Sequence, residues 1–329
     1  MQSRLFLVLI LFVVTGWGQW CDSAVVNDGN AQDYLRRANE RADRGDIDGA
    51  IADYAKALAI DPHFVVAYYS RGVTLQDKGE LDRALADYTK AIELDPSYTA
   101  AYVNRALIWI NKRDFARALA DCDAALALDP RLPEAYGSRG RVFANRGDLD
   151  RAIADFNTAL NLNPTYTRAY VQRGEVWAMK GESDRAMSDY AKALEINPRE
   201  AAAYNTRGAT LAKQGDLDRA LADFNKAIEL NPRSGLAYNN RAYTWFVKGD
   251  WDRAIADYDN CLRFTPWLAD AYYNRGQAWR AKGEVRRALA DAQKAAELNP
   301  TQEKYQKLVQ ELETERQGAS QPSMSHPPR

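Results

Sequence analysis

The chain has 329 residues, of which 46% are hydrophobic and 27% are charged, a composition typical of a folded globular protein rather than a disordered one. Its 44 basic and 45 acidic side chains nearly cancel, so it lacks the basic footprint of a nucleic-acid-binding protein. Three cysteines are too few for a disulfide framework.

The N-terminal segment differs from the rest of the chain. After Arg4 come ten unbroken apolar residues, 5–14 (LFLVLILFVV). A helix that spans a bilayer needs about 20 apolar residues, so this stretch suits the core of a signal peptide better. Residues 1–23 are predicted to be an export signal cleaved after Ser23, with an uncleaved membrane anchor as the alternative. The mature protein would then be periplasmic or secreted, and residues 24–30 form a linker.

A fixed period of 34 residues runs through the chain. Eight prolines mark it without any insertion: Pro62, Pro96, Pro130, Pro164, Pro198, Pro232, Pro266 and Pro300. Such a period is typical of a repeat architecture. Within each unit, two amphipathic stretches are separated by a turn such as KGD or RGD, and the proline closes the second stretch. Each unit is therefore predicted to be a helical hairpin. The units, numbered 1 to 8, are 31–64, 65–98, 99–132, 133–166, 167–200, 201–234, 235–268 and 269–302.

Small and aromatic residues recur at fixed positions, counted from the first residue of each unit. The fourth position is always tyrosine, the eighth is always glycine or alanine, and the twentieth is always alanine, while the twenty-fourth is aromatic in most units. A glycine inside a helix costs about 1 kcal/mol relative to alanine. The repeated glycine therefore predicts that two helices approach closely at this point.

These positions together resemble the tetratricopeptide repeat, over about 272 of the 329 residues. The resemblance implies an all-α fold, a right-handed superhelical solenoid of antiparallel helix pairs in which the first helices line a concave groove. The end repeats depart from the pattern, with Arg41 and Ala292 in place of a large apolar and an aromatic residue. Residues 303–317 are predicted to be a capping helix over the open end, and residues 318–329 a disordered tail.

An arginine and an aspartate also recur, at the seventh and twenty-third positions of every unit. The aspartate shares a helical stripe with two alanine positions, so it is predicted to be buried, and a buried carboxylate needs a partner. The arginine is the predicted partner, either within one unit or across a boundary, with anion binding by the arginines as the alternative. The predicted pairs include Arg71 and Asp87, Arg105 and Asp121, Arg139 and Asp155, Arg173 and Asp189, Arg207 and Asp223, Arg241 and Asp257, and Arg275 and Asp291.

Groups that could carry out catalysis are scarce. The only histidines, His63 and His326, lie in a turn and in the tail, and no metal-ligand or nucleotide-binding motif is present. Cys122 and Cys261 are expected to be buried thiols that pack as small hydrophobic groups. The sequence predicts no enzyme activity, no metal and no cofactor.

The groove positions implied by the resemblance are the second, fifth, sixth, ninth, twelfth and thirteenth of each unit. In a related superhelix, asparagines at the sixth position bind the backbone of an extended peptide, and an amide can donate and accept at once. The alternative is that these are ordinary solvated polar residues. The predicted peptide-binding residues are Asn104, Asn205, Asn239, Asn240, Tyr243, Phe246, Tyr273 and Asn274. The family's clamp for terminal carboxylates is not expected, because Leu35 and Ala100 occupy two of its positions.

The sequence thus predicts an exported, non-enzymatic scaffold that binds a protein or peptide in its groove. One alternative is a structural subunit that assembles an envelope complex or self-associates through its convex face or its ends. Another is an accessory subunit of a separately encoded enzyme. No nucleic-acid partner is expected, and membrane contact is expected only if residues 1–23 are retained.

Overall fold

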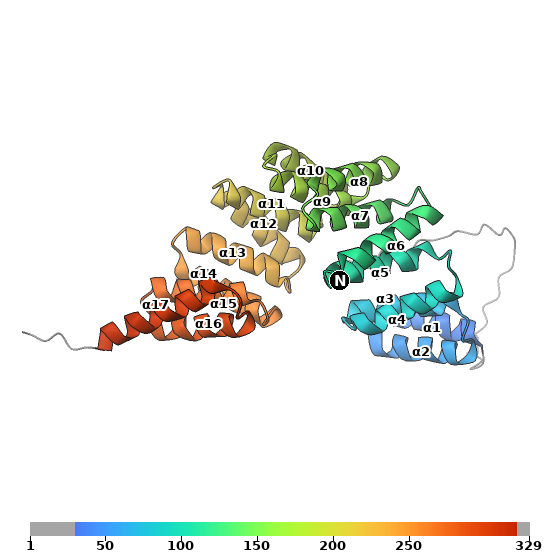
Figure 1. Ribbon diagram of the computed structural model, residues 1–329, viewed down its shortest axis with the longest axis horizontal. Coiled ribbons are helices and arrows are strands. Elements are labelled where there is room, and N and C mark those ends of the chain that lie inside the picture. The colour runs from blue at the N-terminus through green and yellow to red at the C-terminus, as the bar shows by residue number, and fades with distance from the viewer. Residues whose placement is uncertain (1–29, 321–329) are drawn as a thin grey trace, which may run out of the picture. The chain divides into compact units, whose positions relative to one another are not determined.

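The computed structural model describes residues 30–320. The predicted export signal, residues 24–29 of the predicted linker and residues 321–329 of the predicted tail lie outside this range. The described residues form seventeen α-helices and no strand (Figure 1). The prediction of an all-α fold is confirmed.

Consecutive helices pair within each repeat: α1 contacts α2, α3 contacts α4, and the same holds through α15 and α16. The helices are α1 (Ala31–Asp43), α2 (Ile47–Ile60), α3 (Val65–Lys78), α4 (Leu81–Leu94), α5 (Thr99–Asn111), α6 (Phe115–Leu128), α7 (Pro133–Asn145), α8 (Leu149–Leu162), α9 (Thr167–Met179), α10 (Ser183–Ile196), α11 (Ala201–Lys213), α12 (Leu217–Leu230), α13 (Gly235–Val247), α14 (Trp251–Phe264), α15 (Ala269–Ala281), α16 (Val285–Leu298) and α17 (Glu303–Ser320). Odd-numbered helices up to α15 are therefore the first helices of their repeats.

Local sequence sets where these helices begin and end. An acidic residue at the sixteenth position starts the second helix; Asp148, for example, accepts a hydrogen bond from the backbone N–H of Arg151. This satisfies one of the free donors of the first helical turn. The preceding turn needs a left-handed residue, which is Gly79 in repeat 2 with φ 89° and Arg113 in repeat 3 with φ 61°.

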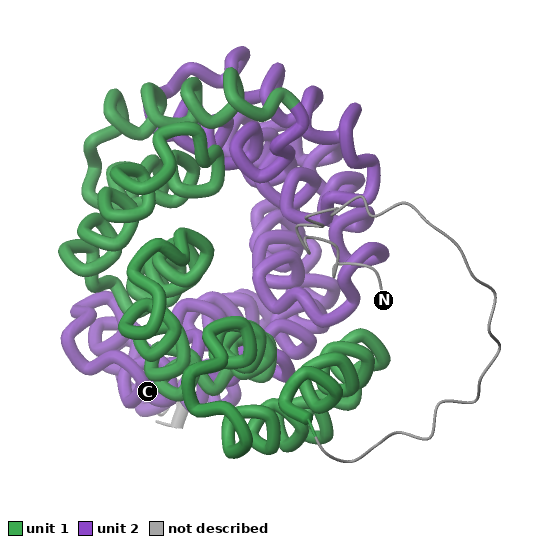
Figure 2. The backbone as a smooth tube through the Cα atoms, turned by 90° about the vertical axis from the view of Figure 1, so that its right-hand side faces the viewer, with its two compact units in different colours: residues 1–164 green, residues 165–329 purple. Residues whose placement is uncertain are grey.

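The chain divides at Pro164 into two compact units, residues 1–164 and 165–329 (Figure 2). Unit 1 holds α1 to α8, and unit 2 holds α9 to α17. Each unit is an array of four helix pairs, and unit 2 carries one additional helix.

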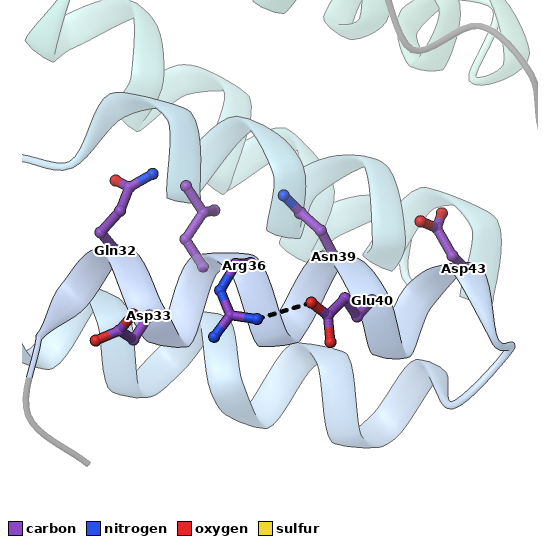
Figure 3. Close-up of a pocket in the computed structure, with 7 residues that line it drawn as sticks. Gln32, Asp33, Arg36, Asn39, Glu40 and Asp43 are labelled. Carbon is purple, nitrogen blue, oxygen red and sulfur yellow. Dashed lines mark hydrogen bonds and ion pairs between the residues drawn. The ribbon is translucent and has the colours of Figure 1, made fainter. Parts of the chain in front are cut away.

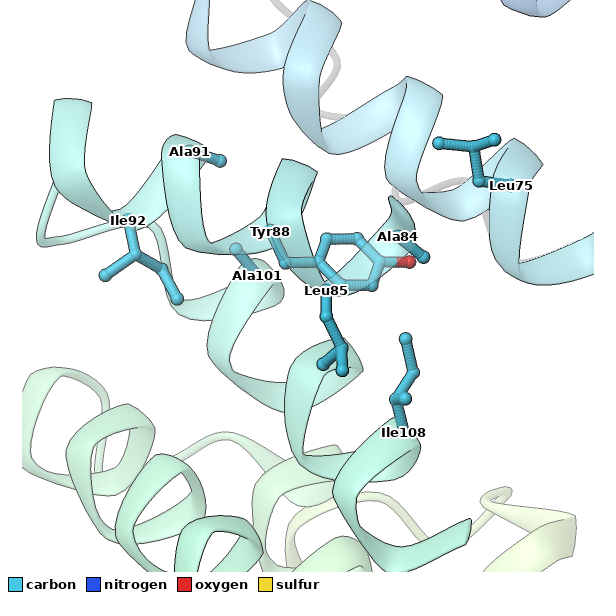
Figure 4. Packing of buried hydrophobic residues seen from close by; sticks show 8 residues of the cluster. All are labelled: Leu75, Ala84, Leu85, Tyr88, Ala91, Ile92, Ala101 and Ile108. Carbon is cyan, nitrogen blue, oxygen red and sulfur yellow. The ribbon is translucent and has the colours of Figure 1, made fainter. Parts of the chain in front are cut away.

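The recurring glycine makes room for the aromatic ring at the twenty-fourth position. A Cβ added to Gly72 would lie 2.7 Å from the Tyr88 ring, and one added to Gly174 would lie 2.6 Å from the Tyr190 ring. Figure 4 shows the Tyr88 ring among the other buried residues of its cluster. The absence of a side chain at the glycine thus lets the first helix approach the ring, as the repeat pattern predicts.

The last helix, α17, covers the end of unit 2. Leu308 and Leu312 pack against Leu289 and Ala292 of α16, so leucines fill the space beside the alanine that replaces an aromatic residue. Arg280 Nη1 also donates to Glu311 Oε2 at 2.7 Å. The helix continues to Ser320, three residues beyond the end expected from the sequence.

Candidate functional site

The recurrent arginine and aspartate meet within one repeat. Arg71 Nε donates to Asp87 Oδ2 and Arg71 Nη2 donates to Asp87 Oδ1, both at 2.7 Å. The same two-point contact, with distances from 2.6 to 2.9 Å, joins Arg37 to Asp53, Arg105 to Asp121, Arg139 to Asp155, Arg173 to Asp189, Arg207 to Asp223, Arg241 to Asp257, and Arg275 to Asp291. Each guanidinium group faces an aspartate of its own repeat. The sequence alone left open whether the aspartate partner belongs to the same repeat or to a neighbouring one.

In two of these pairs, the hydrogen bonds favour the charged form of one partner. Asp53 is fully buried, yet the hydrogen bond from Arg37 outweighs burial and holds the pKa of Asp53 below its usual value. The hydrogen bond to Asp87 likewise raises the pKa of Arg71. Removing Arg71 would leave the Asp87 carboxylate buried without its arginine, whereas Asp53 would keep Arg41, whose Nη1 lies 3.0 Å from Asp53 Oδ2.

A third nitrogen of the arginine often reaches the preceding repeat. Arg105 Nη1 donates to Thr89 Oγ1 at 3.0 Å, and Arg241 Nη1 donates to Asn225 Oδ1 at 2.6 Å. Arg139 reaches Asp123 and Arg275 reaches Asp259 in the same way. The acceptor stands at the twenty-fifth position, where repeat 5 has Ala191, which offers no side-chain acceptor. The arginine thus stabilises its own repeat and, at these boundaries, the stacking of two.

A second set of contacts across repeat boundaries joins exposed charges. Lys78 Nζ lies 2.8 Å from Asp48 Oδ1, and Lys112 Nζ lies 2.7 Å from Asp82 Oδ1. Lys248 pairs with Asp218 and Lys282 with Asp252 in the same arrangement. Repeat 6 has the uncharged Gln214 in place of this lysine. Each exposed pair contributes little to stability, because water and salt screen both charges.

The first helices of unit 2 contact one another in the order α9, α11, α13 and α15. Their second, fifth, sixth, ninth, twelfth and thirteenth positions, which the sequence assigns to the groove, form what we call the first-helix face. Seven of the eight predicted peptide-binding residues belong to unit 2, and Asn104 belongs to unit 1.

Several predicted amides are already hydrogen-bonded within the protein. Asn240 Nδ2 donates to Asn205 Oδ1 at 3.1 Å, and Asn205 is only 7% exposed. In unit 1, Asn104 Nδ2 donates to the Tyr69 hydroxyl at 3.0 Å. Asn205 therefore orients Asn240 instead of presenting itself to solvent. Among the described residues, the Asn274 side chain has no hydrogen-bond partner and is half-buried.

Among the first helices of unit 2, α13 exposes the most large apolar side chains. Tyr243 is 52% exposed, and Leu236 and Val247 on the same helix are also exposed. Phe246 packs against the buried cluster that contains Tyr258. Leu236 and Val247 were not predicted as site residues, although they occupy the second and thirteenth positions, which the resemblance already assigned to the groove.

Tyr273, in contrast, is engaged by the capping helix. Its ring centroid lies 5.4 Å from that of Tyr305 on α17, and its hydroxyl accepts a hydrogen bond from Gln277 Nε2 at 3.2 Å. Less of this side chain is available to a ligand than the sequence suggests.

The comparisons with known proteins decide the family. Models of the tetratricopeptide repeat match residues 38–79, 65–98, 105–180, 167–200, 201–234 and 269–302. The chain is a tetratricopeptide repeat protein. Arrays of this repeat are typical scaffolds for protein–protein interaction. No curated protein matches the chain.

Solved structures of tetratricopeptide repeat arrays resemble this one in fold. A tetratricopeptide repeat protein from Parabacteroides merdae is 25% identical, with a TM-score of 0.56 over 76% of this chain and 98% of that one. Yeast Tom70 is 19% identical, with a TM-score of 0.64 over 92% of this chain and 67% of that one. A chain of the APC/C hetero-tetramer Cut9–Hcn1 is 17% identical, with a TM-score of 0.69 over 85% of this chain. The chain spans 55% of the length of that protein.

A separate hollow of about 440 Å³ lies along α1, in the first tetratricopeptide repeat (Figure 3). Two of its charged lining residues pair with each other, since Arg36 Nη1 donates to Glu40 Oε1 at 2.9 Å. Asn39 Oδ1 accepts a hydrogen bond from the Tyr54 hydroxyl at 2.6 Å. These polar groups already serve the repeat itself.

The described part of this tetratricopeptide repeat protein contains no group of three or more side chains that could hold a metal ion. Cys122 and Cys261 are buried and unpaired. Burial raises the pKa of the Cys122 thiol to about 12, so it is an uncharged, unreactive group at neutral pH. Between residues 30 and 320, no helix has both the length and the apolarity needed to cross a bilayer.

Proposed function

We propose that this protein is a non-enzymatic scaffold whose first-helix face in unit 2 binds an extended segment of a partner protein. One observation carries the proposal: of nine large apolar side chains exposed in the described part of the chain, three lie on a single first helix, α13, at positions of this face. They are Leu236, Tyr243 and Val247. Concentrated exposed apolar surface is typical of an interaction site.

Amides next to this apolar surface suit a peptide backbone. The hydrogen bond from Asn240 Nδ2 to Asn205 fixes the Asn240 side chain and leaves its side-chain oxygen, Oδ1, for a ligand. Asn274 follows on α15 with both amide groups available among the described residues. Fixed amides pay less entropy on binding than mobile ones, so they favour a ligand with regularly spaced peptide groups.

The charges near this face are largely paired. Arg280 contacts Glu311 and Glu315, and Asp270 accepts hydrogen bonds from Lys304 and Tyr305. No strong field of one sign is therefore expected, and the ligand is recognised by shape, apolar contact and amide hydrogen bonds rather than by charge.

The binding experiment compares variants of the whole protein. Peptides selected from a random dodecapeptide display library on the parent protein are labelled, and their Kd values are measured. Replacing Asn240 and Asn274 together by alanine should weaken binding at least about tenfold, which corresponds to the loss of roughly 1.4 kcal/mol. Asn260→Ala on α14 is the matched control and should leave the Kd unchanged. Equal affinities for all three proteins would rule out the proposed face.

Two tryptophans favour a second candidate function, the assembly of a complex or homo-oligomer. Trp267 is 70% exposed in the turn before α15, and Trp251 is exposed at the start of α14, so neither belongs to the first-helix face. If this surface serves assembly, Trp267→Ala should lower the oligomeric mass seen by sedimentation, while peptide binding persists.

Export remains part of the proposal and rests on residues 1–23 alone. The chain recovered from expressing cells should begin at Ala24 and should not sediment with membranes. An N terminus at Met1 in the membrane fraction would favour the anchor instead.

A further inference from the structure

A buried hydroxyl in repeat 7 lacks a partner. The Tyr258 side chain is fully buried, and its hydroxyl has no hydrogen-bond partner in the described part of the protein. Buried polar groups are normally satisfied, so this hydroxyl needs a physical reason. A phenylalanine ring would fill the same space without a hydroxyl, as Phe156 and Phe224 do in repeats 4 and 6.

Other tyrosines at this twenty-fourth position have partners. The Tyr54 hydroxyl donates to Asn39 Oδ1 at 2.6 Å, and the Tyr88 hydroxyl donates to Gln76 Oε1 at 3.0 Å. The Tyr190 hydroxyl lies 3.4 Å from Thr210 Oγ1. The partners come from the ninth or twelfth position of the same repeat, or from the tenth position of the next.

Repeat 7 replaces two of these partner positions with apolar residues. The twelfth position is Phe246, and the tenth position of repeat 8 is Ala278. The ninth is Tyr243, whose side chain is half exposed and does not bond to Tyr258. Alanine has no hydroxyl, so Ala278 cannot meet Tyr258 as Thr210 meets Tyr190.

Repeat 7 has a second buried atom without a hydrogen-bond partner among the described residues, the side-chain oxygen of Asn239. Asn239 occupies the fifth position of its repeat. In repeat 2 the fifth and twenty-fourth positions carry Tyr69 and Tyr88, whose ring centroids are 5.9 Å apart. Because the repeats share one framework, we infer that the Tyr258 donor and the Asn239 acceptor are neighbours as well.

We propose that repeat 7 holds a subsite for a carboxamide side chain, glutamine or asparagine, of the bound peptide. The ligand carbonyl accepts a hydrogen bond from the Tyr258 hydroxyl, and the ligand NH₂ donates to Asn239 Oδ1. The inference rests on the proposed function of the first-helix face and adds the chemistry that one of its positions selects.

Other side chains match the two orphan atoms less well. A carboxylate would face the Asn239 oxygen and lose its hydration, while an ammonium group could not accept from Tyr258. An aliphatic side chain would leave both atoms unpaired. Both atoms are covered in the free protein, so a neighbouring side chain must move to admit the ligand. Burial, with a contribution from Tyr243, raises the pKa of Tyr258, so its hydroxyl remains a neutral donor.

Four pools of fluorescein-labelled dodecapeptides test the subsite. Each pool has random flanks and a fixed central residue, which is glutamine, glutamate, lysine or leucine, and anisotropy reports its binding to the full chain. The glutamine pool should bind about tenfold more tightly than the others. Tyr258→Phe should remove that preference while the leucine pool binds as before. Tyr190→Phe, which removes a hydroxyl that already has a protein partner, is the matched control and should keep the preference.

Two further measurements check the premise. Tyr258→Phe should melt at a higher temperature than the parent, because an unsatisfied hydroxyl is removed. A lower melting temperature would show that an internal water or protein group satisfies the hydroxyl, and would overturn the subsite. Ala278→Thr should abolish the glutamine preference, because threonine both fills the space and supplies the missing acceptor.

The outcomes separate the subsite from the function on which it rests. Equal binding of all pools, or a preference that survives Tyr258→Phe, would refute the subsite and leave peptide binding by the face intact. Failure of every pool to bind would refute both.

Discussion

Repeats 2 and 7 share one framework and differ on the first-helix side. In both, an arginine grips a buried aspartate, Arg71 with Asp87 and Arg241 with Asp257, and a tyrosine fills the space at the twenty-fourth position. The inner polar groups of repeat 2 have hydrogen-bond partners within the protein. The Tyr69 hydroxyl accepts from Asn104, and Tyr88 donates to Gln76, as described above.

Repeat 7 leaves its inner groups incomplete. Asn239 Oδ1 and the Tyr258 hydroxyl are buried without partners among the described residues, and Tyr243 of the same repeat is exposed. Since the framework is the same in both, the difference does not arise from folding requirements. A specialised repeat can therefore be recognised by buried polar atoms that lack hydrogen-bond partners. Each prediction below tests either the shared framework or this difference between the two repeats.

The largest expected effect tests the shared framework. Arg71→Ala and Arg241→Ala should each destabilise the protein by about 3 kcal/mol, because each strands a carboxylate that is 5% exposed. Urea denaturation followed by circular dichroism measures the loss. Asp48→Ala removes an exposed partner of Lys78 and should cost far less than either arginine variant. Similar costs for the buried and exposed pairs would contradict this account of the framework.

A smaller effect is expected where the two repeats pack their helices differently. Gly72→Val should cost about 2 kcal/mol, because the added atoms would overlap the Tyr88 ring. Repeat 7 already accommodates Ala242 at this position, and Ala242→Gly should cost about 1 kcal/mol through helix propensity. The melting temperatures of the two variants give the comparison. An unchanged melting temperature for Gly72→Val would show that the Tyr88 ring can move aside at little cost.

The tyrosines of the two repeats should respond with opposite sign. Tyr88→Phe breaks its hydrogen bond to Gln76 and should destabilise the protein by about 1 kcal/mol. Tyr258→Phe removes an unsatisfied buried hydroxyl and should stabilise it by about 1 kcal/mol. Parallel urea titrations measure both changes, and a shared sign would erase the contrast between the repeats.

The smallest effect concerns the capping helix beside repeat 8. Burial tends to raise the pKa of Asp270, but hydrogen bonds from Lys304 and Tyr305 outweigh it and hold the pKa below the ordinary value of 3.8. The stability from this contact is therefore present above pH 3.8 and is lost as the pH falls through the lower folded-state value. The contribution should be below about 1 kcal/mol, since Asp270 is exposed. Hydrogen exchange in α17 should distinguish the parent from Asp270→Asn at pH 5 and not at pH 2.

Much of the architecture was predictable because it follows from residues that recur. The spacing of the prolines predicted the helix pairs, and the glycine at the eighth position predicted the close approach to the ring. The sequence could not tell which repeat supplies the partner of each arginine, because both choices satisfy the spacing. Distances between side chains were needed to place the pair within one repeat.

The candidate site was less predictable because its residues do not recur. The sequence located the apolar and amide residues of α13 but treated Asn205 as a ligand group, whereas it is buried and supports Asn240. It also placed Tyr273 in the groove without foreseeing its contact with Tyr305. Tyr258 escaped notice because it obeys the repeat pattern, and only its missing neighbours, Phe246 and Ala278, set it apart.

The connections between repeats are unequal, and one junction lacks two of them. Between repeats 5 and 6, Ala191 offers no acceptor to Arg207, and Gln214 carries no charge to meet Asp184. Under mechanical load or partial denaturation, unit 2 should therefore part at this seam before any other. Repeats 6, 7 and 8, with the candidate site, would then remain folded as one piece while repeat 5 separates from them.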